Sequence, residues 1–77
     1  MRRLYYFSGN GRIYKCEYFL ELSYAMYGIK IYELEKNLFV GFIEDMVIPY
    51  HIDKEEMELF KLELTSFIDK LVQDNLY

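Results

Sequence analysis

The sequence predicts an α+β domain in which an antiparallel sheet of about four strands, built from β-hairpins, precedes one long C-terminal helix packed on one face. Three observations lead to this prediction. Aromatic-rich runs alternate with turn-forming residues over 1–50, an amphipathic helical pattern covers 53–76, and no linker separates the two parts. Strands followed by a helix are typical of two-layer domains, so we expect residues 1–77 to form a single domain.

The predicted C-terminal helix has the clearest start signal in the chain. Asp53 can accept hydrogen bonds from first-turn amides as the N-cap, and Glu56 stands three positions later, as in a capping box. The apolar residues that follow form one stripe at helical spacing. They are Met57, Phe60, Leu64, Phe67, Ile68, Leu71 and Val72. Leu59 and Leu62 lie on a different side, where they either contact a sheet edge or loop, or form a dimer or partner interface.

The first predicted hairpin pairs Leu4–Phe7 with Arg12–Tyr18. Between them stand turn-forming residues, of which Asn10 and Gly11 suit the positive φ of a tight hairpin turn. Gly9 and Gly11 also have the spacing of a phosphate loop, but the lysine of a P-loop is missing. We therefore expect a hairpin turn at this position.

The stretch from Tyr14 to Met26 supports two interpretations. Its even positions are all apolar or amphipathic, which favours one long strand, bent near its middle. A helix over 17–27 is the alternative, capped by Gly28. The residues that match helical spacing are Tyr18, Phe19, Leu22, Ala25 and Met26.

A second antiparallel pair is predicted from Ile29–Glu35 and Leu38–Ile43, joined by a turn at 36–37. Gly41 inside the second run indicates a bulge or a close approach of another backbone segment. The short run Met46–Tyr50 contains a proline, so we place it at a sheet edge or in the connection to the helix.

Composition limits the class of protein. With 53% hydrophobic and 19% aromatic residues in 77 positions, the chain is expected to fold as one small domain of modest stability. Cys16 is the single cysteine and His51 the single histidine, so we expect neither a disulfide framework nor a zinc site. No apolar run approaches the roughly 20 residues that cross a bilayer. We therefore expect a cytoplasmic protein without a membrane segment.

Charge is spread unevenly along the chain, whose formal net charge is −4. Residues 1–16 contain four basic side chains and no acid, whereas the C-terminal half is acidic. Aromatic residues alternate with these cations, a mixture that can contact nucleic acid or an acidic protein partner. The candidate contact residues are Arg2, Arg3, Tyr5, Arg12, Tyr14 and Lys15. Nucleic acid is disfavoured because the acidic remainder of the chain opposes phosphate binding.

No group of residues predicts catalysis. His51, Asp53 and Glu55 could in principle hold a metal ion or act as acid and base, but helix capping already explains the two carboxylates. Cys16 occupies an inward-facing position on the predicted strand, where a thiol is inert. We therefore expect a protein that is not an enzyme, with no catalytic, metal-binding or cofactor-binding residues.

Residues 27–31 (YGIKI), the acidic stretch and capped helix that follow, and the ending 71–77 (LVQDNLY) resemble a clostridial family of short proteins of unknown function. The resemblance covers roughly the last fifty residues. The chain departs from the family pattern in that Pro49 and His51 come before Asp53. The resemblance implies a cytoplasmic, non-enzymatic protein of a spore former or one of its mobile elements, with no catalytic residues to carry over.

These observations favour a small regulatory or inhibitory protein that binds another protein, as a monomer or as a homodimer, through the aromatic sheet surface and the face formed by Leu59 and Leu62. The alternative is a nucleic-acid-associated accessory factor of a phage or other mobile element, for example a recombination directionality factor. The two hypotheses differ in the surface that they use, because the second requires the basic hairpin.

Overall fold

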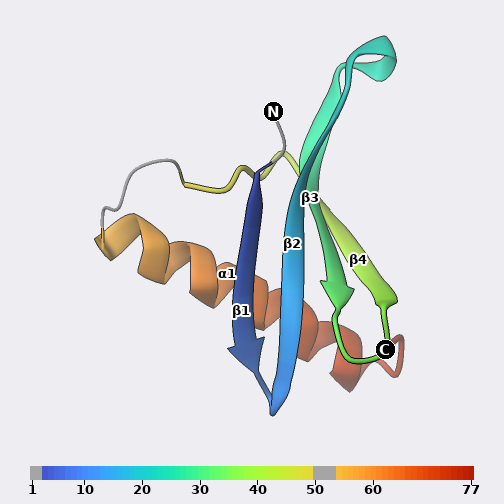
Figure 1. Cartoon of the computed structure of the whole chain (residues 1–77), viewed down its shortest axis with the longest axis vertical. Helices are drawn as coiled ribbons and strands as arrows, with labels where there is room; N and C mark the ends of the chain where they lie inside the picture. Colours follow the sequence, from blue (N-terminus) through green and yellow to red (C-terminus); the bar gives the residue numbers. More distant parts are fainter. Residues whose placement is uncertain (1–2, 50–53) are drawn as a thin grey trace.

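The computed structural model, which describes residues 3–49 and 54–77, confirms the predicted α+β fold. A four-stranded antiparallel sheet in the order β1-β2-β3-β4 is followed by one helix, α1, which runs across one face of the sheet (Figure 1). The opposite face carries no helix in the described part of the chain (Figure 1). The elements are β1 (Leu4–Gly9), β2 (Arg12–Glu21), β3 (Met26–Glu33), β4 (Leu38–Glu44) and α1 (Lys54–Gln73).

The turn between β1 and β2 is the predicted one. Asn10 and Gly11 form a two-residue loop with φ of 54° and 73°, and Gly9 pairs with Arg12 across it. Both central residues adopt the left-handed conformation that matches the twist of a two-residue hairpin, which asparagine and glycine tolerate best. The phosphate-loop pattern is thus fully explained by the turn.

The predicted single strand from Tyr14 to Met26 is wrong, and so is the alternative helix over 17–27. β2 ends at Glu21, the chain reverses through a short 3₁₀ turn at Leu22–Tyr24, and β3 starts at Met26. The Glu21 carboxylate accepts a hydrogen bond from the Ser23 amide at 3.1 Å, and Ala25 adopts φ of 49°. The predicted even-numbered face is correct for Tyr14 and Cys16 of β2, but after the reversal the buried residues of β3 are odd-numbered, as at Ile29 and Ile31. No glycine, proline or asparagine marked the turn itself.

Gly41 lies at the predicted bulge in β4, and the close approach at this position comes from a side chain and not from the expected backbone segment. The β3–β4 register shifts beside it, from Ile31 opposite Gly41 to Tyr32 opposite Phe39. A Cβ atom at Gly41 would stand 2.8 Å from the Phe67 ring of α1, so the missing side chain lets the helix approach the sheet closely. Residues 46–49 form the connection to the helix and no strand.

The helix ends three residues before the predicted boundary at Leu76. Asn75 adopts φ of 58°, the Leu76 amide donates to the Leu71 carbonyl at 2.9 Å, and the Asn75 amide donates to the Val72 carbonyl at 3.1 Å. These bonds form a Schellman motif, which satisfies the last free carbonyls and stops the helix at Gln73. The predicted Asp53 cap lies outside the described residues.

The core lies between α1 and the helix-side face of the sheet. Val72, which the helical pattern placed in the core, is 43% exposed because it stands at the margin of the apolar stripe. Leu59 and Leu62 are each 61% exposed, as expected for residues off that stripe. The buried hydrophobic residues are Tyr14, Cys16, Ile29, Ile31, Ile48, Phe60, Leu64 and Ile68.

Candidate functional site

The structure does not bring the candidate contact residues of the basic hairpin onto one surface. Tyr5 packs edge-on against Phe60 of the helix, with the two ring centres 5.3 Å apart. Tyr14 is only 1% exposed and cannot reach a partner. Lys15 lies on the opposite face of the sheet, because neighbouring residues of a strand point to opposite sides. Arg2 lies outside the described residues, and Arg3 takes part in contacts of its own.

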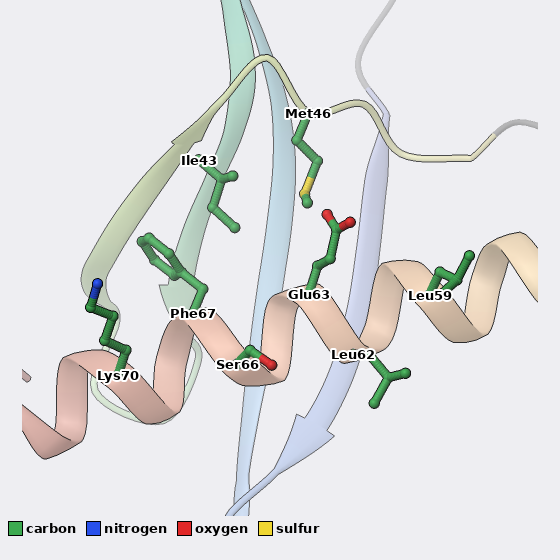
Figure 2. A pocket seen from close by; sticks show the side chains of 8 residues that line it. All are labelled: Ile43, Met46, Leu59, Leu62, Glu63, Ser66, Phe67 and Lys70. Atoms are coloured by element: carbon green, nitrogen blue, oxygen red, sulfur yellow. The ribbon is translucent and has the colours of Figure 1, made fainter.

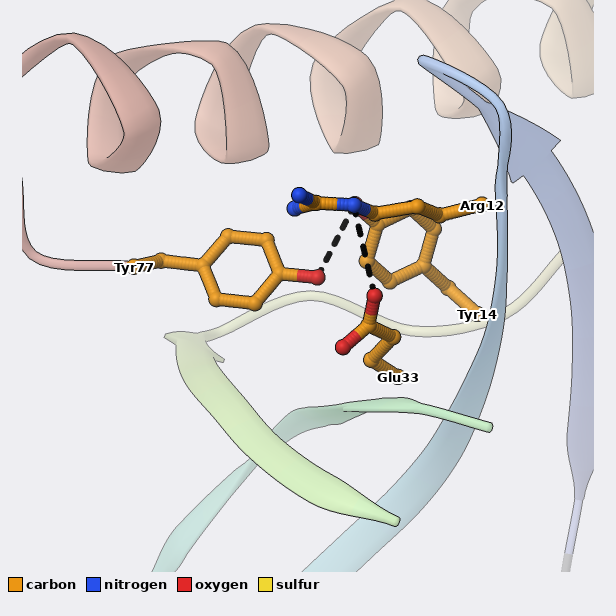
Figure 3. A network of polar contacts seen from close by, with 4 residues as sticks. All are labelled: Arg12, Tyr14, Glu33 and Tyr77. Atoms are coloured by element: carbon orange, nitrogen blue, oxygen red, sulfur yellow. Dashed lines mark hydrogen bonds and ion pairs between the residues drawn. The ribbon is translucent and has the colours of Figure 1, made fainter. Parts of the chain in front are cut away.

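Arg12, the next of these candidates, belongs to a polar network at one end of the core (Figure 3). Its Nε lies 3.4 Å from Oε1 of Glu33, a carboxylate that is only 1% exposed. Tyr77 donates a hydrogen bond to the Tyr14 hydroxyl at 3.3 Å and accepts one from Arg12. The second Glu33 oxygen, Oε2, is buried and has no hydrogen-bond partner in the described part of the chain.

The network fastens the C-terminal end of the chain to the first hairpin. The hydrogen bond with Tyr77 raises the pKa of Arg12, and burial raises the pKa of the Tyr77 hydroxyl, so both groups keep their protons at neutral pH. A guanidinium, a carboxylate and two neutral phenols provide neither a nucleophile nor a base directed at an open cavity. We assign the network a structural role.

An apolar groove runs beside α1, on the flank that faces β4 and the following segment (Figure 2). It has a volume of about 440 Å³. Leu59 and Leu62 border it from the helix, together with Glu63 and Lys70, whose charges stand among the apolar side chains. We call this surface the groove. Its lining residues are Ile43, Met46, Leu59, Leu62, Glu63, Ser66, Phe67 and Lys70. A second hollow, which shares Met46, Leu59 and Glu63, extends the groove toward Val47 and Pro49.

The face of the sheet opposite α1 combines aromatic rings with lysines. The Nζ of Lys15 lies 4.9 Å from the ring centre of Tyr32, and that of Lys30 lies 4.1 Å from the ring centre of Phe19. Tyr6, Lys15, Tyr32 and Phe39 stand opposite one another in a single row across all four strands. We call this surface the open face. It comprises Leu4, Tyr6, Ile13, Lys15, Glu17, Phe19, Glu21, Lys30, Tyr32, Phe39, Phe42 and Glu44.

The aromatic rings of the open face contact one another, yet several of them stay accessible to solvent. Phe19 meets Phe42 with ring centres 5.8 Å apart, and Tyr32 meets Phe39 at 5.5 Å. Gly28 lies beneath the first pair, where a Cβ atom would stand 2.6 Å from the Phe42 ring. Phe39 and Tyr6 remain 52% and 53% exposed. The open face is therefore an aromatic surface of mutually packed rings with a large solvent-accessible area.

The β2–β3 hairpin projects beyond the rest of the sheet as an arm (Figure 1). Its tip exposes apolar side chains, with Leu22 81% and Tyr24 80% accessible. This arm is a third exposed apolar feature, but it is narrow and offers no concave surface.

Sequence reasoning missed most of the open face. Phe19, Tyr32, Phe39 and Phe42 were assigned to strands without being assigned to a side. The signal was present, because the residues between the inward-facing positions of a strand must share the other face. Pairing Lys15 with its cross-strand neighbours required the register, which depends on the unmarked turn after Glu21.

The remaining chemical candidates stay apart. His51 lies outside the described residues, and Glu55 takes part in contacts of its own. Cys16 is 0% exposed, and burial raises the pKa of its thiol to about 12. Within 3–49 and 54–77, no three His, Cys, Asp or Glu side chains are grouped as a metal site.

Together, the fold and these surfaces define a two-layer α+β domain whose exposed features suit binding. Comparisons with family models, with curated proteins and with solved structures gave no match to this chain. Across the described residues, no helix has both the length and the apolar character needed to cross a membrane.

Proposed function

We propose that this chain is a small, non-enzymatic regulatory or inhibitory protein that acts by binding another protein through the groove. One observation carries the proposal: Leu59 and Leu62, each 61% exposed, border a continuous apolar hollow between the helix and the segment after β4. Exposed apolar patches of this kind on a small protein are typical of interaction sites.

The chemistry of the groove supports a protein partner. Met46 and Phe67 line its wall, and methionine adapts its shape to different apolar surfaces. Glu63 and Lys70 stand among the apolar side chains, where charges of opposite sign can fix the orientation of a partner. We further propose a cytoplasmic location, because the only thiol of the chain is buried and needs no oxidising compartment.

The alternative is a nucleic-acid-associated accessory factor of a phage or other mobile element. The clostridial resemblance of residues 27–31 and 71–77 implies only a protein of a spore former or of one of its mobile elements. The cation–ring pairs of the open face favour this alternative, because bases stack on aromatic rings next to lysines. The withdrawal of Arg12 and Tyr14 into the polar network weighs against it, since the hairpin loses two of its predicted contacts.

A capture experiment at about 0.15 M salt tests the proposal, because this ionic strength screens long-range attraction. The wild-type chain is immobilised next to a Leu59→Ser/Leu62→Ser variant and a Leu22→Ser variant. Leu22 is an equally suitable control because it is 81% exposed on the arm, away from the groove. We expect the partner protein to be retained by the wild type and the arm variant and lost by the groove variant.

Capture of the same protein by all three chains would contradict the groove as the binding site. Absence of any protein partner, together with tight binding of single-stranded or duplex DNA by the wild type, would replace the proposal by the alternative.

A further inference from the structure

The open face carries charges of both signs in nearly equal number. Lys15 and Lys30 supply two positive charges, and Glu17, Glu21 and Glu44 supply three negative ones on the same side of the sheet. A polyanion such as nucleic acid binds where positive charge is in excess, because its affinity comes from neutralised phosphates. A surface that carries both signs between aromatic rings, without an excess of positive charge, instead matches a copy of itself.

We propose that the open face binds a second copy of this chain, giving a homodimer in which the two sheets pack face to face. In such a twofold contact the same patch serves both partners, so each lysine of one copy meets the glutamates of the other. Sheets packed in this way lie about 10 Å apart, a spacing that aromatic side chains from both sides fill.

The size of the open face fits this occupant. Its four strands are six to ten residues long, which at about 3.3 Å per residue and about 4.8 Å between strands gives a face of roughly 20 to 33 Å by 15 to 20 Å. With large side chains projecting from it, a face of this size has an accessible area on the order of the roughly 800 Å² per partner that a stable interface buries. The groove lies on the other side of the sheet, against α1, and stays free for a different protein.

Because the core of the monomer is small, binding a second copy is expected to stabilise the fold. A 77-residue domain buries only about 60 to 65% of its unfolded surface, and the rings of the open face add little to its core. Covering Tyr6 and Phe39, which are 53% and 52% exposed, removes further apolar area from water. The dimer is therefore the more stable form of the protein.

The first test measures the solution mass by light scattering over a range of protein concentrations. The wild type is expected at twice the 9.4 kDa of one chain, falling toward a single chain on dilution. Phe39→Lys places a charge within the contact, on edge strand β4, and raises the dimer dissociation constant about tenfold or more. Leu62→Lys makes the same kind of change in the groove and leaves the mass at that of the dimer.

A charge reversal separates a second copy from nucleic acid. Glu17→Lys gives the open face an excess of positive charge and dissociates the dimer, whereas Glu63→Lys changes the net charge equally on the helix and does not. A wild type that binds a single-stranded oligonucleotide as a monomer, with affinity increased by Glu17→Lys, would overturn the proposal. So would a dimer that Leu62→Lys dissociates and Phe39→Lys leaves intact, or a wild type that stays monomeric at about 0.5 mM.

Chemical labelling of the wild-type protein tests the same proposal and does not depend on whether a variant folds. Amine labelling of Lys15 and Lys30 is expected to slow several-fold when the protein concentration is raised above the dimer dissociation constant. Lys54 and Lys61 on the helix serve as internal controls whose labelling stays constant. Protection of the helix lysines in place of those on the sheet would contradict the proposal.

Discussion

On the helix side of β3, Ile29, Ile31 and Glu33 are buried, whereas on its other side Lys30 and Tyr32 keep part of their surface in contact with water. The same strand thus contributes to a closed core and to an open aromatic surface. The difference arises because the α-helix seen in residues 3–49 and 54–77 covers one of the two faces of the sheet (Figure 1). A strand pattern with large apolar residues on both sides therefore indicates a second surface, for which a partner must be sought.

Substitutions at adjacent residues of β3 give the strongest test of the difference between the buried face and the open face. Ile31→Ala removes a side chain that is 0% exposed and is expected to lower the free energy of unfolding by about 2 to 5 kcal/mol. Tyr32→Ala on the open face is expected to cost about 1 kcal/mol in the monomer, from its contacts with Phe39 and Lys15. Urea denaturation at low protein concentration measures both, and equal losses would contradict the assignment of faces.

Two of the strand glycines, Gly28 and Gly41, are expected to show the opposite order, with the larger loss of stability on the open face. A Cβ atom at Gly28 on the open face would meet the backbone oxygen of Ile43 and the Phe42 ring, and backbone cannot move aside. At Gly41 the neighbour is the Phe67 ring, which can shift. We expect Gly28→Ala to cost about 3 kcal/mol and Gly41→Ala about 1 kcal/mol in thermal unfolding. A larger loss for Gly41→Ala would indicate that the helix cannot adjust its position.

Removing a cation from each face is also expected to lower the stability by different amounts. Arg12→Ala leaves the Glu33 carboxylate buried without its partner and is expected to lower the stability clearly, although less than the loss of a fully buried pair would, because the Arg12 side chain is 39% exposed. Lys15→Ala is the matched control and should cost well under 1 kcal/mol, since its ammonium only covers a ring. Chemical denaturation of both variants at pH 7 provides the measurement. A neutral Arg12→Ala would show that Glu33 does not depend on this ion pair.

The last predicted effect on stability, from the thiol of Cys16, is confined to alkaline pH. Its thiol pKa rises from 9.0 to about 12 on burial, so the native protein holds the proton that the unfolded chain loses above pH 9. This contribution to stability is fully present below pH 9 and is lost as the pH rises toward 12. A Cys16→Ala variant is therefore expected to lose less stability between pH 8 and 11, as measured by urea midpoints. At pH 8, a disulfide reagent should label native Cys16 much more slowly than the unfolded chain, because the native thiol is both protonated and inaccessible.

Much of the fold could be predicted because local signals agreed with one another. The Asn10–Gly11 turn, the period-two strands and the helical stripe from Phe60 to Ile68 each need only a few neighbouring residues to be recognised. The bulge at Gly41 followed from the rarity of glycine inside strands.

The errors have physical reasons as well. The turn at Leu22–Tyr24 is built from a carboxylate contact and a left-handed alanine, which sequence rules do not anticipate. The basic hairpin failed as one surface because a strand sends alternate residues to opposite faces, so Tyr14 and Lys15 could not act together. Leu59 and Leu62 were found because each stands far from the core stripe of a helix whose phase was clear.

The most direct test of the account compares side-chain resonances of the wild type by NMR while the protein is diluted. We predict that the ring signals of Tyr6, Tyr32 and Phe39 shift with concentration, because the second copy covers the open face, while the methyl signals of Leu59 and Leu62 stay constant. Shifts confined to Leu59 and Leu62 would place the contact between copies at the groove, and an unchanged spectrum would show that the open face carries no second copy.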